Sequence, residues 1–325
     1  MKNTNFDIIG DIHGNARVLE RLLKKLGYER TSEKDTYRHK ERTAIFVGDL
    51  IDRGNENFKT LKIVKQMTDE GSALIVMGNH EYNALCFHTK NEKGEFLRPH
   101  TPKNTGQHKA VLAEIEIQGE ETWDYFLDWF RRMPLFLELN GIRVVHACWK
   151  QSLIDKLERM NYRDDRGYLT DGFLFESSIK GTEAFTIVDT LLKGEEIRLP
   201  DSHVGIEDKD GNIRKKMRLK WWLSHEEKLN ITTYDEGVRS DNKSLEKIKG
   251  IPIPHDLLAE IRDNDWNLKL NTPVFFGHYW FTGLAEPLNN KAACLDYSAG
   301  LGGPLVCYRW DGESNLDRTK FIWSN

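Results

Sequence analysis

Residues 6–14 read FDIIGDIHG, a short apolar run that ends in an aspartate and a histidine framed by glycines. The run over residues 6–9 is typical of a buried strand. Residues 15–26 follow with apolar side chains at i, i+3 and i+4 spacing, which predicts an amphipathic helix, and Gly27 is well placed to end it. A strand that passes through a polar turn into a helix is the start of a βαβ unit.

The same succession is repeated further along the chain. Residues 43–47 predict a second strand, the pattern over residues 58–67 predicts a helix that Gly71 ends, and residues 73–77 predict a third strand. Alternating strands and helices favour a parallel sheet in an α/β fold. Further strands are predicted at residues 135–139 and 142–146, which Asn140-Gly141 joins as a hairpin, and at residues 273–276, 292–295 and 305–310.

Between residues 150 and 270 the composition changes to charge-rich segments. We interpret residues 151–270 as an inserted cap region with its own helices, which leaves residues 1–150 and 271–325 as the main domain. Within the cap, residues 214–222 interleave basic and aromatic side chains. They predict either a solvated helix face with two tryptophans packed inward, which we favour, or a surface that grips a polyphosphate, a base or a strand end.

The composition limits the classes of protein to consider. The chain has 325 residues, with 47 Lys and Arg against 51 Asp and Glu, so it is long enough for about two domains or one with an insertion. The near-neutral charge argues against a general nucleic-acid-coating protein. The four cysteines show no CxxC spacing, and no apolar run is long enough for a signal peptide or a membrane span. We therefore expect a cytoplasmic protein with no membrane partner.

Polar residues that can bind metal follow the predicted strands, one cluster after each. The clusters are Gly-Asp-Ile-His-Gly at residues 10–14, Gly-Asp-Leu-Ile-Asp-Arg-Gly at 48–54 and Gly-Asn-His-Glu at 78–81, and single histidines follow two later strands at His146 and His278. Ligands in open α/β sheets collect beyond the carboxyl ends of the strands, so these loops can converge. The mixed oxygen and nitrogen set suits Mn²⁺, Fe, Zn²⁺ or Ni²⁺. It could fill one octahedral ion, but its spread over five loops fits two ions better.

These motifs resemble the calcineurin-like metallophosphoesterase superfamily, in its phosphoprotein-phosphatase-like branch. Residues 6–14 are most similar to bacterial symmetrical dinucleoside tetraphosphatases and to the phosphatase domain of bacterial polynucleotide kinase–phosphatases. The resemblance covers roughly residues 6–150 and 272–310. It implies an α/β (α+β) fold in which a two-layer β-sandwich is flanked by helices and holds a dinuclear metal centre between its sheets.

The resemblance also implies a role for individual residues. Asp11 and His13 would bind the first metal, Asp49 would bridge both, and Asn79, His146 and His278 would complete the second site. His80 would be the general acid, with Asp52 paired to it and raising its pKa. Arg53 would hold the phosphate, since a guanidinium matches two phosphoryl oxygens. Asp296, which follows a later strand, resembles an acidic residue that acts on the first metal through water.

The chain departs from the family pattern at a few places. Tyr279-Trp280 follow His278 where many phosphodiesterases carry a second histidine, and Trp149 follows His146 where relatives usually place a glycine. We expect Trp149 to reshape the rim of the pocket. In relatives a second phosphate-binding arginine often lies between His146 and His278; the sequence does not place it, and Arg163 and Arg166 are candidates.

Together these features predict a metal-dependent phosphoesterase that hydrolyses phosphate monoesters or phosphoanhydrides, with nucleotide-type substrates favoured, by attack of metal-bound hydroxide. Two divalent ions are the expected cofactors, with manganese preferred. A phosphorylated small molecule or nucleotide is the expected partner, and a nucleic-acid end or a phosphoprotein is an alternative. The rival functions are a protein Ser/Thr phosphatase and, in another class, a non-catalytic scaffold or nucleic-acid-binding protein that uses the insertion. No Walker A loop is present, so kinase chemistry is not expected.

Overall fold

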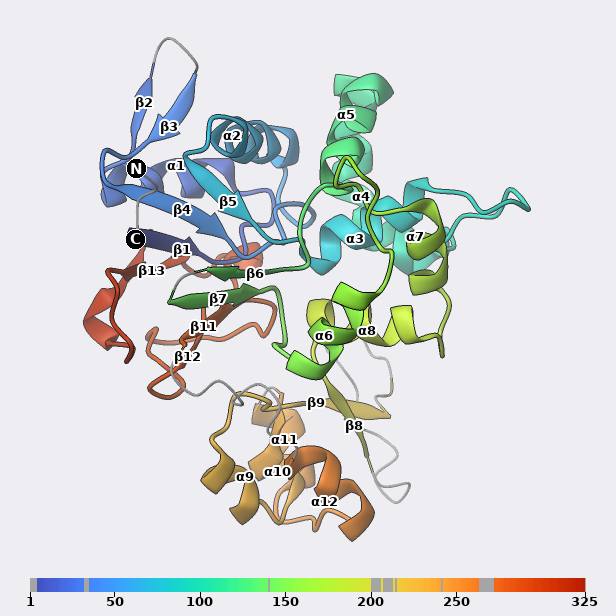
Figure 1. The fold of residues 1–325 in the computed structure, drawn as a ribbon, viewed down its shortest axis with the longest axis vertical. Helices are drawn as coiled ribbons and strands as arrows, with labels where there is room; N and C mark the ends of the chain where they lie inside the picture. The colour runs from blue at the N-terminus through green and yellow to red at the C-terminus, as the bar shows by residue number, and fades with distance from the viewer. Residues whose placement is uncertain are drawn as a thin grey trace.

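The computed structural model describes residues 5–31, 35–139, 141–199, 206, 213, 215–240, 242–262 and 272–324. It is a mixed α/β structure in which one sheet lies against a second and helices cover the outside (Figure 1). The expected fold class is therefore confirmed. None of the helices in these residues is long and apolar enough to cross a membrane.

The first sheet contains the strands that the opening sequence predicts. Its strand order is β14-β13-β1-β4-β5. β1 (Asn5–Ile9), β4 (Arg42–Phe46) and β5 (Ala73–Ile75) run parallel, with Phe6 opposite Thr43 and Ala44 opposite Ala73. β13 (Val306–Trp310) and β14 (Phe321–Trp323) extend the sheet antiparallel. The parallel strands all end at the same edge.

The second sheet has the order β12-β11-β7-β6. The predicted hairpin is present as β6 (Phe136–Leu139) and β7 (Ile142–Val145). β11 (Val274–Phe276) pairs in parallel with β7 on one side and with β12 (Ala292–Cys294) on the other. One apolar cluster joins strands of both sheets through Ile8, Ile45, Val144, Phe275 and Tyr308. This cluster is the core of the predicted sandwich.

Helices pack on the first sheet because each presents an apolar stripe to it. In α1 (Ala16–Leu26) the stripe is Leu19, Leu22, Leu23 and Leu26, and Gly27 ends the helix with φ of 89°. α2 (Asn57–Asp69) packs beside α1, and the two lie together in Figure 1. The short hairpin of β2 (Glu29–Thr31) and β3 (Thr36–Arg38) joins α1 to β4. The remaining helices of this half are α3 (Asn79–His88), α4 (Pro102–Gln118) and α5 (Glu120–Phe130).

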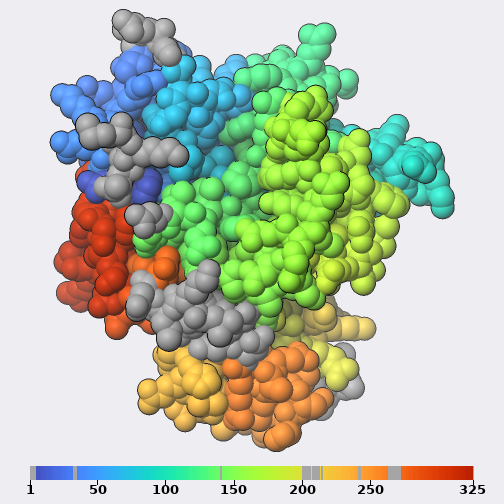
Figure 2. Space-filling model, viewed as in Figure 1, coloured from blue at the N-terminus to red at the C-terminus, as the bar shows by residue number. Residues whose placement is uncertain are grey.

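The region predicted as a cap contains two kinds of structure. Its first helices, α6 (Gln151–Arg159), α7 (Asp171–Ser178) and α8 (Glu183–Lys193), bury their apolar side chains in the same core as α1 to α5. The later part has a core of its own, formed by side chains such as Ile197, Met217 and Tyr234. It is the yellow and orange mass at the lower end of Figure 2. The division of the chain at residues 150 and 270 stays a prediction.

The later part of the cap is a small sheet covered by short helices. Its strand order is β10-β9-β8. The strands are β8 (Glu196–Arg198), β9 (Lys216–Leu219) and β10 (Val238–Arg239), and the helices are α9 (His225–Asn230), α10 (Tyr234–Gly237), α11 (Asn242–Ile248) and α12 (His255–Arg262). Among the described residues there are also two 3₁₀ turns: Ala299–Leu301, which contacts His13 and Arg53 in the loops after β1 and β4, and Arg318–Lys320, which directly precedes β14.

The helix predicted over residues 214–222 is wrong. Residues 216–219 form β9, because they pair with β8 on one side and β10 on the other. Arg214 lies outside the described residues. The two tryptophans are nevertheless packed inward: Trp221 and Trp222 lie with ring centroids 4.8 and 5.4 Å from that of Phe276 on β11. These contacts pack the segment after β9 against β11 of the second sheet.

Candidate metal centre

The loops that follow strands of both sheets meet at one edge of the sandwich. The loops after β1 and β4 and the start of α3 come from the first sheet, and the loops after β7, β11 and β12 come from the second. Together they carry a set of buried polar side chains: Asp11, His13, Asp49, Asn79, His146, His278 and Asp296. All of these are residues that the sequence singled out.

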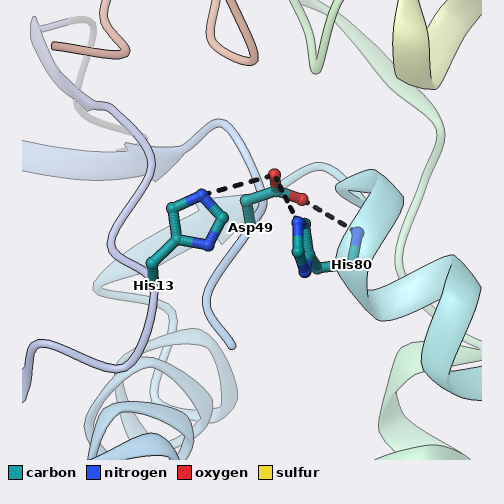
Figure 3. A group of neighbouring side chains, drawn as sticks. All are labelled: His13, Asp49 and His80. Carbon is teal, nitrogen blue, oxygen red and sulfur yellow. Dashed lines mark hydrogen bonds and ion pairs between the residues drawn. The ribbon is translucent and has the colours of Figure 1, made fainter. Parts of the chain in front are cut away.

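Asp49 lies at the centre of this set. One of its carboxylate oxygens, Oδ2, is 3.7 Å from His13 Nε2 and 3.9 Å from His80 Nε2, while Oδ1 is 3.4 Å from His146 Nε2. Figure 3 shows His13 and His80 on either side of the carboxylate. Two groups of potential ligands result, His13–Asp49–His80 and Asp49–His146–His278, and within each group the ligand atoms lie within 4.8 Å of one another. Asp49 belongs to both.

Several buried polar atoms in the site fit a bound cation. Asp11 Oδ1, His13 Nε2 and His278 Nε2 are buried and lack a hydrogen-bond partner among the described residues. An unsatisfied buried donor or acceptor costs free energy, so such atoms need a partner. His13 Nδ1 lies 3.0 Å from the carbonyl oxygen of Ile51, to which it can donate, and this arrangement leaves Nε2 free for a metal.

His146 gives a second observation of the same kind. Its Nδ1 lies 2.7 Å from the carbonyl oxygen of Val47, so the other ring nitrogen of the neutral imidazole is an acceptor. That nitrogen faces two oxygens, Asn79 Oδ1 at 3.1 Å and Asp49 Oδ1 at 3.4 Å. A cation between these three atoms stabilises them. Without a metal a proton on His146 does so, since burial lowers the pKa of His146 but the charge of Asp49 outweighs it and raises that pKa. The donor set fits a divalent metal in place of that proton.

Charge in the site is unbalanced towards the acidic side. Burial, and then the charges of Asp296 and Asp49, raise the pKa of Asp11 well above its usual value. Burial alone also raises the pKa of Asp49, but the neighbouring His146 and His80 outweigh it and lower that pKa. Asp296 accepts hydrogen bonds from the backbone N–H groups of Trp280 and Ser298, at 2.7 and 2.9 Å. Its oxygens are therefore engaged by the loop, which fits an indirect action on a metal.

The backbone of these loops is held in the left-handed region at several non-glycine residues. His13, Asp49, Asp52 and His278 have φ of 51°, 51°, 70° and 73°. Such residues cost about 1–3 kcal/mol each and cluster at functional sites. At Gly48, with φ of 97°, a Cβ would lie 2.4 Å from the backbone nitrogen of Gly78, so the loops after β4 and β5 cross in contact.

Glu81 has a part in the site that the sequence did not assign. Its carboxylate accepts from the backbone N–H groups of Asp49 and Leu50, both at 2.8 Å, and from that of Gly78 at 3.0 Å. Burial, and then the charge of Asp49, raise the pKa of Glu81 to about 7. Glu81 thus ties the Asp49 loop to the first turn of α3. The feature of the sequence that could have indicated this role is the position of Glu81 directly after Asn79 and His80.

His80 and Asp52 form the predicted pair. His80 Nδ1 donates to Asp52 Oδ2 at 2.5 Å. Burial lowers the pKa of His80, but the charge of Asp49 and the hydrogen bond to Asp52 outweigh it and raise that pKa to about 9. The other oxygen of Asp52 accepts from His108 Nδ1 at 2.8 Å. His108 comes from α4 and is buried, and no motif in its sequence neighbourhood indicated this role.

Arg53 lies at the mouth of the site. Its side chain is exposed, and its guanidinium carbon lies 4.3 Å from the ring centroid of Trp280, whose ring in turn stacks on that of His13 at 5.4 Å. Beyond Arg53 opens a cavity of about 400 Å³. Its lining includes metal-site residues and the cations Arg53, Arg98, Lys103, Lys193 and Arg218.

The expected candidates for a second phosphate-binding arginine lie elsewhere. Arg163 donates to the carbonyl oxygens of Gly167 and Met133, and Arg166 pairs with Asp164, and neither lines the cavity. Arg218 on β9 does line it, where its Nε donates to the carbonyl oxygen of Lys193 at 2.9 Å.

The expectation that Trp149 shapes the rim of the pocket is also wrong. Trp149 is fully buried against Phe136 and Arg143, outside the lining of the cavity, because the backbone after His146 turns into the core.

Comparison with known proteins shows the family of this chain. The family model for the calcineurin-like phosphoesterase matches residues 4–207. A bis(5′-nucleosyl)-tetraphosphatase of the asymmetrical type from Oceanobacillus iheyensis is 35% identical over 156 residues, which cover 47% of this chain and 60% of that protein. One of the symmetrical type from Marinomonas sp. is 32% identical over 149 residues, covering 44% of this chain and 45% of that protein. The matches thus span only about half the length of these curated relatives.

Similar solved structures include a protein serine/threonine phosphatase from Saccharomyces cerevisiae. It is 14% identical, with 99% of this chain and 79% of that chain covered and a TM-score of 0.47. The family itself rests on the sequence match, which includes the motifs after β1, β4, β5 and β7. Because the family model matches more than half of the residues of this chain, the chain belongs to the calcineurin-like phosphoesterase family.

Proposed function

We propose that this chain, a phosphoesterase by family, hydrolyses phosphate monoesters or phosphoanhydrides of nucleotide type with the help of divalent metal ions. The observation that supports it most is the convergence of buried ligand atoms on Asp49 from both sheets. A scaffold protein has no physical need for such a set, since buried unpartnered donors and acceptors destabilise the fold.

The ligand set divides around Asp49. Asp11 and His13 would hold one cation and Asn79, His146 and His278 the other, with Asp49 shared between them and Asp296 orienting the loop beside the first. Manganese suits the mixed oxygen and nitrogen donors, with Fe, Zn²⁺ or Ni²⁺ as alternatives. When bound, paired divalent ions lower the pKa of a shared water and neutralise phosphoryl charge.

The remaining residues handle the proton and the substrate. The neighbouring Asp49 and Asp52 raise the pKa of His80, and His80 would donate its proton to the leaving-group oxygen. Asp52 holds the ring of His80 through Nδ1, so that Nε2 carries the proton towards the site. Arg53 would bind phosphoryl oxygens, and Trp280 beneath it limits where the guanidinium can lie.

The cap would add to this site. We propose that residues 151–270 act as a cap on a catalytic domain of residues 1–150 and 271–325. Lys193 and Arg218 reach the cavity from this region. Arg218 would supply the second guanidinium for the phosphate in place of Arg163 and Arg166. A cytoplasmic location is the matching proposal for the whole protein, since Cys86, Cys148, Cys294 and Cys307 are all free thiols.

The substrate class follows from the charge of the cavity and from the relatives. The names of the two relatives describe enzymes that act on dinucleoside tetraphosphates. A cavity rimmed by several cations favours a polyanion of that kind over a singly phosphorylated protein side chain. A protein Ser/Thr phosphatase stays the alternative.

The test uses the purified chain with added Mn²⁺. We expect it to hydrolyse 4-nitrophenyl phosphate, and Asp49→Asn to lose at least about 100-fold in kcat/KM on this substrate. His80→Ala should lose as much on an alkyl phosphate, whose leaving group needs a proton, and less on 4-nitrophenyl phosphate. Arg166→Gln, which removes a cation outside the cavity, is the matched control and should retain full activity. If both site variants match the wild type, the assignment is wrong. Comparison of diadenosine tetraphosphate with phosphoserine peptides then separates the two substrate classes.

A further inference from the structure

Arg98 lies in the catalytic cavity, at a place to which the mechanism above gives no role. It follows α3 in the sequence and precedes α4, and its guanidinium lies between these helices. Nη1 donates to Asn83 Oδ1 at 3.0 Å and Nη2 donates to Gln107 Oε1 at 2.8 Å. Both partners are neutral, and no carboxylate of the described residues forms an ion pair with Arg98. Its positive charge is therefore positioned but not neutralised within the described structure.

The contacts of Arg98 place it on the same side of the centre as the general acid. Its partner Gln107 is next to His108 in α4, and His108 donates to Asp52, which holds His80. Arg218 belongs to the other side, on β9 of the cap. Figure 1 shows α3 and α4 above, and β9 below, the level of β6 and β7. The two arginines thus reach the same cavity from segments that lie on different sides of β6 and β7 in this view.

This arrangement bears on the charge of the leaving group. The general acid lies where the leaving group departs, so whatever is attached to the departing oxygen extends towards Arg98. Lys103, exposed on the first turn of α4, lines the same part of the cavity. Arginine offers five N–H donors, and only two of those of Arg98 are used by Asn83 and Gln107. The others can bind phosphoryl oxygens.

We propose that Arg98, assisted by Lys103, forms a second anion subsite that binds the leaving group of the substrate through a phosphoryl group. This proposal rests on the proposed function and sharpens it: the bond cleaved is a phosphoanhydride, with a phosphate on each side. In the reaction, the oxygen of water bonds to the phosphorus held at the centre, and the bond from this phosphorus to the bridging oxygen breaks. The departing phosphate takes the proton of His80, and the proton of the water goes to solvent.

The kinetic test compares a leaving group that carries phosphoryl groups with one that carries none. Arg98→Gln is expected to lower kcat/KM at least tenfold for diadenosine tetraphosphate and less than about twofold for 4-nitrophenyl phosphate. Arg98→Lys should retain an intermediate activity on the anhydride, because it keeps the charge and loses the bidentate geometry. Lys103→Gln, which replaces an exposed side chain, should change the same ratio in the same direction.

A binding test has a readout that is independent of turnover. Calorimetric titration of the Mn²⁺-loaded protein with methylenediphosphonate and with orthophosphate measures the subsite directly. Arg98→Gln should weaken the diphosphonate about tenfold and leave orthophosphate within twofold. Lys109→Gln is the control, because Lys109 is an exposed cation of α4 that does not line the cavity. It is expected to change the affinity for neither the diphosphonate nor orthophosphate.

The outcomes separate this proposal from the proposed function. Equal losses of Arg98→Gln on both substrates, or no loss on either, overturn the subsite, since a structural defect affects all substrates alike and an idle residue affects none. A wild-type chain that hydrolyses neither substrate contradicts the proposed function. In that case the difference between diphosphonate and orthophosphate binding still decides whether the subsite exists.

Discussion

His108 illustrates what a single side chain adds to this site. Asp52 has two carboxylate oxygens, one for His80 and one for His108, so the carboxylate is held from both sides. Burial raises the pKa of Asp52, but the hydrogen bonds from His108 and His80 outweigh it and lower that pKa. His108 thus acts through Asp52 on the orientation of the general acid, and it is a positioning residue.

Replacement of His108 should affect substrates according to their leaving groups. We expect His108→Phe to lower kcat about tenfold for alkyl phosphates, whose leaving groups need a proton, and much less for 4-nitrophenyl phosphate. KM should stay within about twofold, and His108→Asn should restore part of the rate because its amide can donate in place of Nδ1.

The measurement is the slope of log kcat against the pKa of the leaving group for wild type and variants. A structural defect would lower all rates in parallel and leave the slope unchanged, which would contradict the positioning role. The positioning role would also be contradicted if His108→Phe retained both the slope and the rates of the wild type.

At the scale of elements, the site depends on how closely two loops approach each other. The loop after β4 and the loop that begins α3 touch at Gly48 and Gly78, and Glu81 accepts hydrogen bonds from both. A side chain at this crossing would push Asp49 away from the histidines around it. Glycine is therefore required at position 48 for two reasons: a Cβ would collide with the backbone of Gly78, and φ is 97°.

Gly48→Ala is expected to be strongly destabilising. Its Cβ would lie 2.4 Å from the nitrogen of Gly78, and the left-handed backbone adds strain, so we expect a loss of about 3 kcal/mol or more in the free energy of unfolding. Gly71→Ala is the matched control, because its φ is 66° but no atom lies within 4 Å of the new Cβ. It should cost only about 1–2 kcal/mol. Urea unfolding of both variants measures the difference, and equal losses would show that the crossing adds nothing.

The contact between α3 and α4 has a pH dependence of its own. His88 Nε2 lies 3.3 Å from His108 Nε2, and burial, then the charges of His108 and His100, lower the pKa of His88 to about 4. The unfolded chain, with a histidine pKa near 6.5, binds more protons between these values. This histidine therefore costs stability progressively as the pH falls from about 6.5 to about 4.

His88→Asn should flatten that part of the pH profile. Thermal unfolding at pH 7, 5.5 and 4.5 measures it, with His225→Asn on the surface of the cap as the control for removal of a histidine. A variant whose Tm falls as steeply with pH as that of the wild type would contradict the assignment to His88.

At the scale of the whole molecule, the site joins the two sheets through buried charge. Asp11 and Asp49 from the first sheet face His146 and His278 from the second, and Asp296 adds a further carboxylate. Without a counter-charge, the like-charged carboxylates repel one another and weaken the contact between the sheets. Divalent cations should therefore stabilise the entire fold.

Addition of Mn²⁺ to protein treated with a chelator should raise Tm. A free ion concentration 100-fold above its Kd contributes about 2.7 kcal/mol, which corresponds to a rise of about 4 °C for a chain of 325 residues. Asp11→Asn removes one ligand and should reduce the rise by more than half. Scanning calorimetry with and without Mn²⁺ measures both, and an unchanged Tm on addition of the ion would contradict a buried metal site.

The alternation of β1, α1, β4, α2 and β5 in the first third of the chain could be predicted because it depends on local periodicity, whereas the hairpin of β2 and β3 was not predicted. The run over residues 6–9, the stripe of leucines in α1 and the hairpin at residues 135–146 all appear where the pattern indicates. The strand β9 was not predicted. Its residues alternate basic and apolar side chains, which is the period of a half-buried strand, but the run has only four residues, and the favoured interpretation of residues 214–222 was a helix. Pairing with β8 and β10, distant in sequence, selects the strand.

The sequence by itself determined which residue types follow each strand, because a glycine-framed Asp, His or Asn is a local property of the chain. Only the tertiary structure decided which other side chains reach them. His108 and Arg98 come from α4 and the segment before it, and no motif marks them, whereas Arg218 on β9 belongs to the basic and aromatic stretch at residues 214–222 that the sequence singled out. Their positions result from the packing of helices and of the cap against the sandwich, and such contacts between distant segments are not encoded in any local pattern.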